Sequence, residues 1–268
     1  MPIAELGGIS MNYDTNGDGE PVVLVMGTGA RGRTWHLRQV PALVAAGFST
    51  VTFDSRGVPP TRAPGDDWTI DDMVRDTVAL IDHLGLGACR FVGFSLGSYV
   101  VQELALAYPQ RVRQLALIAA RGRTDPFHQA ITRAEIGLVE RGVDVGEEFY
   151  GAVDTLRLVS PRTFQDEEQV AIWLESFQMA RAGGSSAVLP QLRIEIMPNR
   201  LAAYRSITAP TLVIGFENDM VSPAYLSREV ARSVHGARYV EIEGVGHLGY
   251  LESPEEVNKQ LLEFFHSS

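Results

Sequence analysis

Short apolar runs recur along most of the chain and alternate with amphipathic stretches. The runs are continuous rather than alternating, and they are rich in β-branched and aromatic side chains. Such runs are typical of parallel strands that are buried on both faces of a sheet. The pattern therefore predicts an α/β fold with a mostly parallel sheet. The predicted strands are residues 21–26, 48–53, 90–94, 112–119, 211–215 and 238–242.

Amphipathic stretches between and after these runs predict helices that pack on the sheet. In residues 69–84 the apolar positions form one stripe, and acidic residues crowd the first turns, where the helix dipole favours them. Residues 95–108 predict a helix that ends before Pro109, because proline cannot continue a helix. Two further helices are predicted at residues 223–234 and 254–265.

The alternation stops between residues 123 and 204. This stretch contains amphipathic helical patches and no strand-like run, and residues 183–186 (GGSS) indicate a break between helices. Strand-like runs then resume. The sequence thus predicts a core formed by residues 1–122 and 205–268, into which residues 123–204 are inserted as a helical cap.

Composition narrows the class of partner. The formal net charge of −10 argues against nucleic acid and against an anionic membrane surface, since both attract basic proteins. Cys89 is the only cysteine, so no internal disulfide is possible. The chain begins without a signal-peptide pattern, and a cytoplasmic location is expected. Lys259 is the only lysine among 23 basic side chains, which is typical of a GC-rich genome.

A G-x-S-x-G string, residues 93–97 (GFSLG), lies between a predicted strand and a predicted helix. In this context the string is typical of a nucleophile elbow, a sharp turn that exposes the serine hydroxyl. The helix start behind the turn supplies free N–H groups for a developing oxyanion. Ser95 is therefore the candidate nucleophile. On this string alone, a serine that caps the helix is the alternative interpretation.

Serine needs a base to become a nucleophile, and the base needs an acid to orient it. His247 lies in a glycine-rich loop (GVGHLG) after the last predicted strand. Asp219 follows the strand before it, with Glu217 as the second choice. Loops after parallel strands meet at one edge of the sheet. The sequence thus predicts a triad of Ser95, Asp219 and His247.

A second glycine-rich string, residues 27–32 (GTGARG), has the form G-x-G-x-x-G, and Asp54 ends the next strand. Together they imitate a dinucleotide-binding site. However, Pro41 interrupts the helix that such a site requires. The same loop can instead supply the Thr28 N–H, which with the Leu96 N–H would form an oxyanion hole. We therefore expect no cofactor and no metal.

Five segments together resemble the α/β-hydrolase superfamily over residues 8–265. They are VVLVMGTG, VTFDSRG, FVGFSLGS, TLVIGFENDMVSP and EGVGHLGYLESPEEV. The resemblance implies an α/β-hydrolase fold, with a sheet of about eight strands and a helical cap, and it implies the same triad. Met26 precedes Gly27 where many relatives have histidine, which is similar to some esterases, including anthracycline methylesterases. A serine at the elbow is unlike haloalkane dehalogenases and epoxide hydrolases, which use aspartate there.

The expected reaction is hydrolysis of an ester, lactone or thioester of an apolar small molecule through an acyl-enzyme. The same fold and triad also support elimination, cyclisation in polyketide tailoring, and perhydrolysis. A ligand-binding protein without catalysis and a nucleotide-dependent enzyme remain as further alternatives. The candidate pocket residues are Met26, Phe94, Trp173, Phe177 and Leu248.

Overall fold

An eight-stranded sheet lies at the centre of the part of the chain that the structure, a computed structural model, describes: residues 2–181 and 189–267. The break predicted at residues 183–186 lies outside these residues. The strand order is β1-β2-β4-β3-β5-β6-β7-β8; the ladders that join β1, β2 and β4 are antiparallel and the rest are parallel. The strands are β1 (Ile3–Leu6), β2 (Ile9–Asn16), β3 (Glu20–Val25), β4 (Phe48–Phe53), β5 (Cys89–Phe94), β6 (Val112–Ile118), β7 (Thr211–Phe216) and β8 (Arg238–Ile242).

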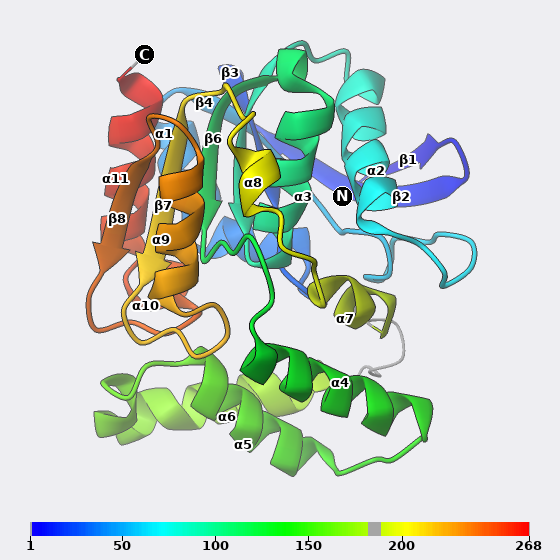
Figure 1. Ribbon diagram of the computed structural model, residues 1–268, viewed down its shortest axis with the longest axis vertical. Coiled ribbons are helices and arrows are strands. Elements are labelled where there is room, and N and C mark those ends of the chain that lie inside the picture. Colours follow the sequence, from blue (N-terminus) through cyan, green and yellow to red (C-terminus); the bar gives the residue numbers. More distant parts are fainter. Residues whose placement is uncertain (1, 182–188, 268) are drawn as a thin grey trace.

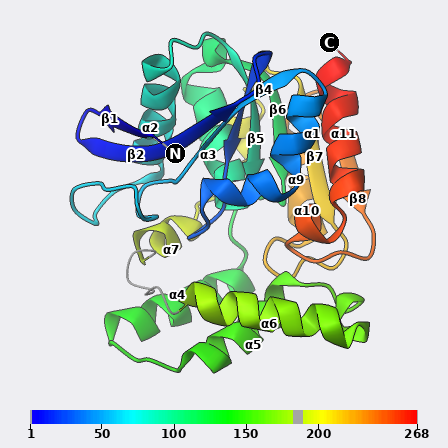
Figure 2. The same cartoon turned by 180° about the vertical axis from the view of Figure 1, so that it is seen from behind.

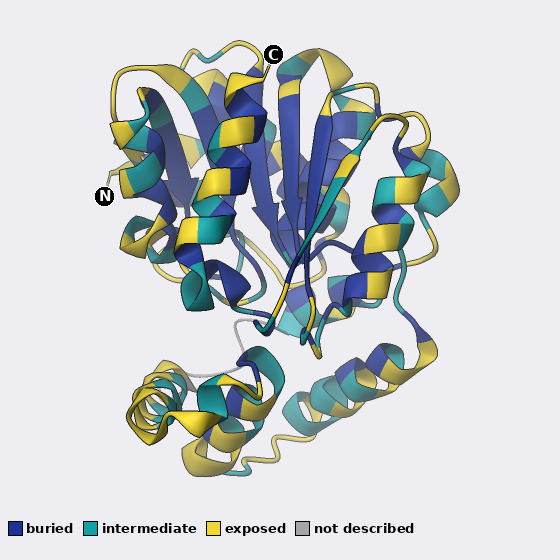
Figure 3. Cartoon of the chain, turned by 90° about the vertical axis from the view of Figure 1, so that its left-hand side faces the viewer, coloured by how far each residue is buried: buried dark blue, intermediate teal, exposed yellow. Residues whose placement is uncertain are grey.

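Helices cover both faces of the sheet (Figures 1 and 2), which explains the continuous apolar runs. In β3, Val23 and Val25 pack with α2, α3 and α9 on one face, while Val22 and Leu24 pack with α1 and α11 on the other. Figure 3 shows the central strands as almost entirely buried. These helices are α1 (Gln39–Ala45), α2 (Ile70–His83), α3 (Leu96–Ala107), α9 (Ala224–Ser233) and α11 (Pro254–His266).

The structure confirms the predicted fold class, with a mostly parallel sheet between two layers of helices. Each predicted strand and helix of the core is present, with bounds within one residue of those expected. The hairpin of β1 and β2 was not predicted. Polar residues such as Ser10 and Asn12 interrupt its apolar positions, so it lacks the continuous run on which the prediction depended.

Three helices of the inserted stretch lie together beyond the carboxyl edge of the sheet (Figures 1 and 2): α4 (Pro126–Glu140), α5 (Glu147–Leu158) and α6 (Glu167–Arg181). Helix α7 (Leu189–Glu195) lies between them and the core. The short helix α8 (Leu201–Tyr204) packs against α3 and α9 of the core. The division at residues 123 and 204 stays a prediction. Among the described residues, no helix has the length and apolar character that a membrane span requires.

Candidate active site

The turn between β5 and α3 presents Ser95 in a backbone conformation that is rare for a side-chain-bearing residue, with φ of 53° and ψ of −117°. Glycines on either side make this turn possible. A Cβ on Gly97 would lie 2.1 Å from the Val25 carbonyl oxygen, and a Cβ on Gly93 would lie 2.5 Å from the Gly97 carbonyl oxygen. The Ser95 side chain is partly exposed, although its neighbours in sequence are buried. The turn therefore holds its hydroxyl at the end of the sheet.

His247 lies between this serine and a carboxylate. Its Nε2 is 3.1 Å from Ser95 Oγ, and its Nδ1 is 2.8 Å from Asp219 Oδ2. Because a carboxylate accepts hydrogen bonds, Nδ1 donates, and a neutral ring then offers its lone pair at Nε2 to the serine proton. The three side chains predicted from the sequence are thus joined in one line of hydrogen bonds.

The acid is held by backbone amides. Asp219 Oδ1 accepts the N–H groups of Val221 and Ser222 at 2.8 and 2.7 Å, which leaves Oδ2 for the histidine. The carboxylate is completely buried. Glu217, the second choice, is exposed and accepts the N–H of Gly244 instead. Only one of the two candidate acids therefore reaches the histidine.

The loop that carries His247 is fixed from two sides. The ring packs against Phe94, with 4.8 Å between the centroids. The Gly246 N–H donates to Glu252 at 2.6 Å, and the Leu248 N–H donates to the Leu158 carbonyl at the end of α5, at 3.0 Å. The inserted helices thus contribute directly to the position of the histidine loop.

The glycine loop after β3 lies against the nucleophile. A Cβ on Gly27 would lie 3.1 Å from Ser95 Cβ, which is closer than an ordinary van der Waals contact, so glycine suits this approach. Thr28 follows in this loop, and its hydroxyl donates to Glu195. Leu96 is the first residue of α3, where an amide has no acceptor within the helix. The two predicted oxyanion donors therefore belong to segments that flank Ser95.

The competing dinucleotide interpretation depended on Asp54. This carboxylate is buried and accepts the Gly32 N–H at 2.8 Å and the Asn12 side-chain amide at 2.7 Å. It therefore anchors the glycine loop to the sheet. A short 3-10 helix spans Gly32–Leu37 and α1 begins at Gln39, so the long helix of a nucleotide fold is absent here, although the break lies at Arg38 and Pro41 itself is within α1.

The pocket candidates fall into two groups. Met26 and Phe94 are buried in the core, while Leu248 is partly buried beside the histidine. Trp173 and Phe177 stack on each other along α6 with 5.6 Å between ring centroids. Their assignment to a substrate pocket stays a prediction.

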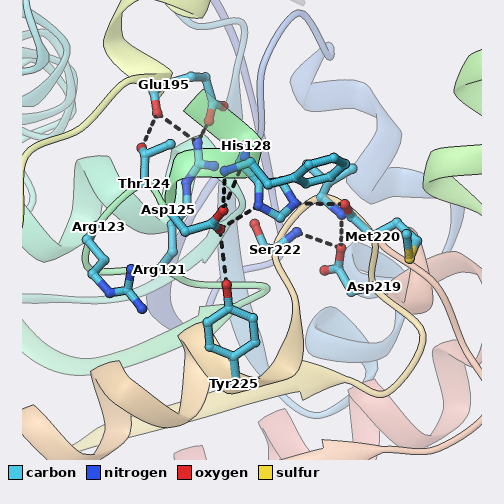
Figure 4. A network of polar contacts seen from close by, with 12 residues as sticks. Arg121, Arg123, Thr124, Asp125, His128, Glu195, Asp219, Met220, Ser222 and Tyr225 are labelled. Atoms are coloured by element: carbon cyan, nitrogen blue, oxygen red, sulfur yellow. Dashed lines mark hydrogen bonds and ion pairs between the residues drawn. The ribbon is translucent and has the colours of Figure 1, made fainter. Parts of the chain in front are cut away.

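Sequence reasoning missed a polar network at the start of α4, shown in Figure 4. The ring of His128 lies 2.5 Å from Asp125 Oδ2 and 2.9 Å from the Met220 carbonyl oxygen. Tyr225 also donates to Asp125, at 3.1 Å. Because Met220 follows Asp219, this network holds the acid loop from outside. A D-P-F-H string at a helix start was its only local signal.

An ion pair that the sequence did not predict lies on the other side of this network (Figure 4). The guanidinium of Arg121, three residues after the end of β6, is buried and pairs with Glu195 of α7. Burial lowers the pKa of Arg121 to about 10, and the carboxylates of Asp219 and Asp125 oppose that shift. Glu195 is the same carboxylate that accepts the Thr28 hydroxyl. The pair therefore joins the inserted stretch to the glycine loop.

Comparisons with known proteins agree with this architecture. A model described as "Alpha/beta hydrolase family" matches residues 22–260. The chain is 42% identical over 259 residues to BpoC, a putative non-heme bromoperoxidase of Mycobacterium tuberculosis, which covers 97% of this chain and 98% of that protein. The crystal structure of BpoC from strain H37Rv has a TM-score of 0.93 at 41% identity and covers 98% of both chains.

Two further relatives carry other names. The chain is 28% identical to RutD of Azorhizobium caulinodans, a putative carbamate hydrolase, over 98% of both chains. The structure of a thermophilic esterase from Thermogutta terrifontis has a TM-score of 0.84 at 25% identity, and it covers 99% of this chain and 98% of that one. The likeness therefore extends over the sheet and the inserted helices alike.

Proposed function

The chain belongs to the α/β-hydrolase family and is an enzyme of that family, and on this premise we propose that it hydrolyses an ester, lactone or thioester of an apolar small molecule with Ser95 as nucleophile. One observation carries the proposal: hydrogen bonds run without a gap from the buried Asp219 through His247 to the partly exposed hydroxyl of Ser95. An oriented base beside an accessible serine is the arrangement that acyl transfer needs.

The first half of the reaction forms an acyl-enzyme. Ser95 Oγ attacks the carbonyl carbon of the substrate while His247 Nε2 takes its proton, and Asp219 stabilises the imidazolium. The N–H groups of Thr28 and Leu96 donate to the oxygen as it gains negative charge, and removing one such donor typically costs about 10²–10³-fold in kcat. The imidazolium then gives its proton to the leaving alcohol or thiol.

The second half releases the acid. A water molecule attacks the acyl carbon while His247 again takes a proton, and the imidazolium then returns this proton to Ser95 Oγ as the ester bond to Ser95 breaks. The names of two relatives, a putative carbamate hydrolase and an esterase, support cleavage of an acyl group by water. The net charge of −10 favours an uncharged substrate over an anionic one.

The first test is covalent labelling with turnover. We expect a fluorophosphonate to add to Ser95, as measured by intact mass and peptide mapping, and Ser95→Ala to lose at least about 10³-fold in kcat on a short-chain p-nitrophenyl ester. Ser98→Ala is the matched control. Ser98 lies one turn further along α3, and its hydroxyl donates to the carbonyls of Gly93 and Ile118. Full turnover in Ser95→Ala would refute the assignment.

Perhydrolysis is a second candidate, because the 42% identical relative carries the name of a putative non-heme bromoperoxidase. Hydrogen peroxide would replace water in the second half: it attacks the acyl carbon, Ser95 leaves with a proton, and a peracid forms. We expect peracid to be detected by bromide-dependent halogenation when peroxide and a carboxylic acid are supplied. Ser95→Ala should abolish this activity with the esterase activity. Peracid formation that survives the substitution would exclude the acyl-enzyme route.

A further inference from the structure

Helix α7 presents two polar side chains to the glycine loop after β3. Gln191 Oε1 accepts the N–H of Gly29 at 2.7 Å, and Glu195 accepts the hydroxyl of Thr28. The two residues are four positions apart, so they lie on one face of the helix. Consecutive residues of the loop are therefore held by consecutive turns of one helix.

Both side chains are themselves fixed. Gln191 is completely buried, and its amide nitrogen donates to the Arg56 carbonyl at 2.7 Å, which ties α7 to the loop after β4. The Glu195 side chain is almost completely buried and pairs with the buried Arg121, while its backbone carbonyl accepts Arg121 Nη2 at 3.1 Å. A carboxylate and an amide without freedom to turn can set the position of the groups that they bind.

The sheet holds the far end of this loop, where Asp54 accepts the Gly32 N–H, but the ladder of β3 does not reach Thr28 and Gly29. Strand β3 ends at Val25, so the amides beyond it are outside the ladder. Within the loop, the Ala30 N–H donates to the Gly27 carbonyl at 3.2 Å, and Gly29 has a left-handed φ of 67°. The oxyanion donor assigned to this loop, the Thr28 N–H, therefore depends on contacts from outside for its direction.

We propose that Glu195 and Gln191 are positioning residues that hold the Thr28 N–H in the direction required to stabilise the oxyanion. This inference rests on the proposed function. It assigns part of the catalytic geometry to the inserted stretch, through the Thr28 hydroxyl and the Gly29 amide. A helix that only packs the insertion onto the core would use the same contacts for stability and would leave the chemistry unchanged.

The test uses Thr28→Val and Gln191→Leu in the full chain. Thr28→Val removes the hydroxyl and keeps both the branched shape and the pair of Arg121 with Glu195. We expect each variant to lose about tenfold or more in kcat with KM nearly unchanged. The Ki of a boronic acid, whose tetrahedral adduct on the serine mimics the oxyanion, should rise by the same factor as kcat/KM falls. Thr28→Ser should restore both values.

Thr155→Val is the matched control, because this buried threonine of α5 returns its hydroxyl to the Gly151 carbonyl of its own helix at 2.7 Å. It should retain kcat and the boronic acid Ki. If Thr28→Val and Gln191→Leu lower Tm but keep kcat and the Ki within twofold of the wild type, the positioning role is wrong. If the wild type itself shows neither labelling nor turnover, the proposed function fails first, and the two failures are distinguishable.

Discussion

The backbone of Ser95 is strained, and hydrogen bonds from neighbouring elements hold it in this conformation. A non-glycine residue at positive φ costs on the order of 1–3 kcal/mol. Its N–H donates to the Ile118 carbonyl at 3.0 Å, and its carbonyl accepts the Ser98 N–H at 2.9 Å. These bonds join β6, β5 and α3 at one residue. The strain is therefore sustained by the sheet and the helix together, and it keeps the hydroxyl at the site.

The glycines of the elbow provide the first prediction at this scale. Gly97→Ala places a methyl group 2.1 Å from the Val25 carbonyl oxygen. The backbone can make room for this group only if β3 or α3 moves. We expect a loss of about 3 kcal/mol or more in the free energy of unfolding, measured by urea denaturation.

Gly137→Ala in α4 is the control for this substitution. A Cβ at Gly137 meets no atom within 4 Å. Alanine also favours the helix over glycine by about 1 kcal/mol, so this variant should be slightly more stable than the wild type. Equal and small effects at the two positions would contradict the tight turn.

The three residues of the candidate triad could be predicted because each one follows a strand, and the ends of parallel strands meet at one edge of a sheet. The sequence favoured Asp219 over Glu217 although both follow β7, and in the structure it is the Asp219 carboxylate that contacts His247 while Glu217 accepts the Gly244 N–H. Glu195 and Gln191 could not be predicted. They reach the glycine loop from the inserted stretch, and no local pattern tells which side of an inserted helix faces a distant loop.

At the scale of elements, the start of α4 joins a helix cap to the acid loop. Asp125 accepts the N–H groups of Phe127 and His128 at 2.9 and 3.1 Å, as an N-cap does. Burial acts to raise the pKa of Asp125. The hydrogen bonds that Asp125 accepts from the amide and the ring of His128, together with the charge interaction with this ring, outweigh burial and lower the pKa of Asp125 to about 2. The same ring reaches the Met220 carbonyl, so the cap also restrains the loop of Asp219.

Asp125→Ala should therefore lower the free energy of unfolding by about 1–2 kcal/mol near neutral pH. The folded pKa lies below the ordinary value of 3.8, so this stabilisation is present above about pH 4 and is lost as the pH falls toward 2. The difference between wild type and variant should shrink over that interval in urea denaturation series.

Asp166→Ala is the matched control for that series. Asp166 accepts the Gln169 N–H at 3.1 Å at the start of α6 and is exposed. Asp166→Ala should lower the free energy of unfolding by less than Asp125→Ala does. The same loss and the same pH dependence in both variants would show that the partners of Asp125 add nothing to an ordinary cap.

The elements themselves could be predicted where burial decides them. A strand covered on both faces is apolar at most of its positions, so β5 and β7 could be recognised in the sequence. The edge hairpin of β1 and β2 is half exposed, and its mixed pattern resembles a loop. Helix α1 was also not predicted. Pro41 lies in its first turn, where proline is tolerated, but in a sequence a proline indicates the interruption of a helix.

At the scale of the whole molecule, the inserted stretch contacts each loop of the candidate site. Helix α4 binds the acid loop through His128, the end of α5 binds the histidine loop through Leu158, and α7 binds the glycine loop through Gln191 and Glu195. The site is therefore assembled from both the core and the insertion. Changes in the insertion should alter reaction geometry as well as access.

Net charge acts on the whole molecule in a different way, through the approach of the substrate. The charge of −10 repels anions over a distance set by the Debye length, which is about 30 Å at 0.01 M salt and about 10 Å at 0.1 M. A neutral ester experiences no such force. Salt should therefore change the reaction rate according to the charge of the substrate, independently of its shape.

We expect kcat/KM for an anionic ester, such as a monosuccinate, to rise as salt increases from 0.01 to 0.1 M, because screening removes repulsion. A neutral ester of similar size should stay constant, and a cationic choline-type ester should fall. Each substrate serves as a control for the other two, because an effect of salt on folding or on the triad would change kcat/KM for all three in the same direction. A fall for the anionic ester would mean that the local field of Arg121 and its neighbours outweighs the net charge at the site.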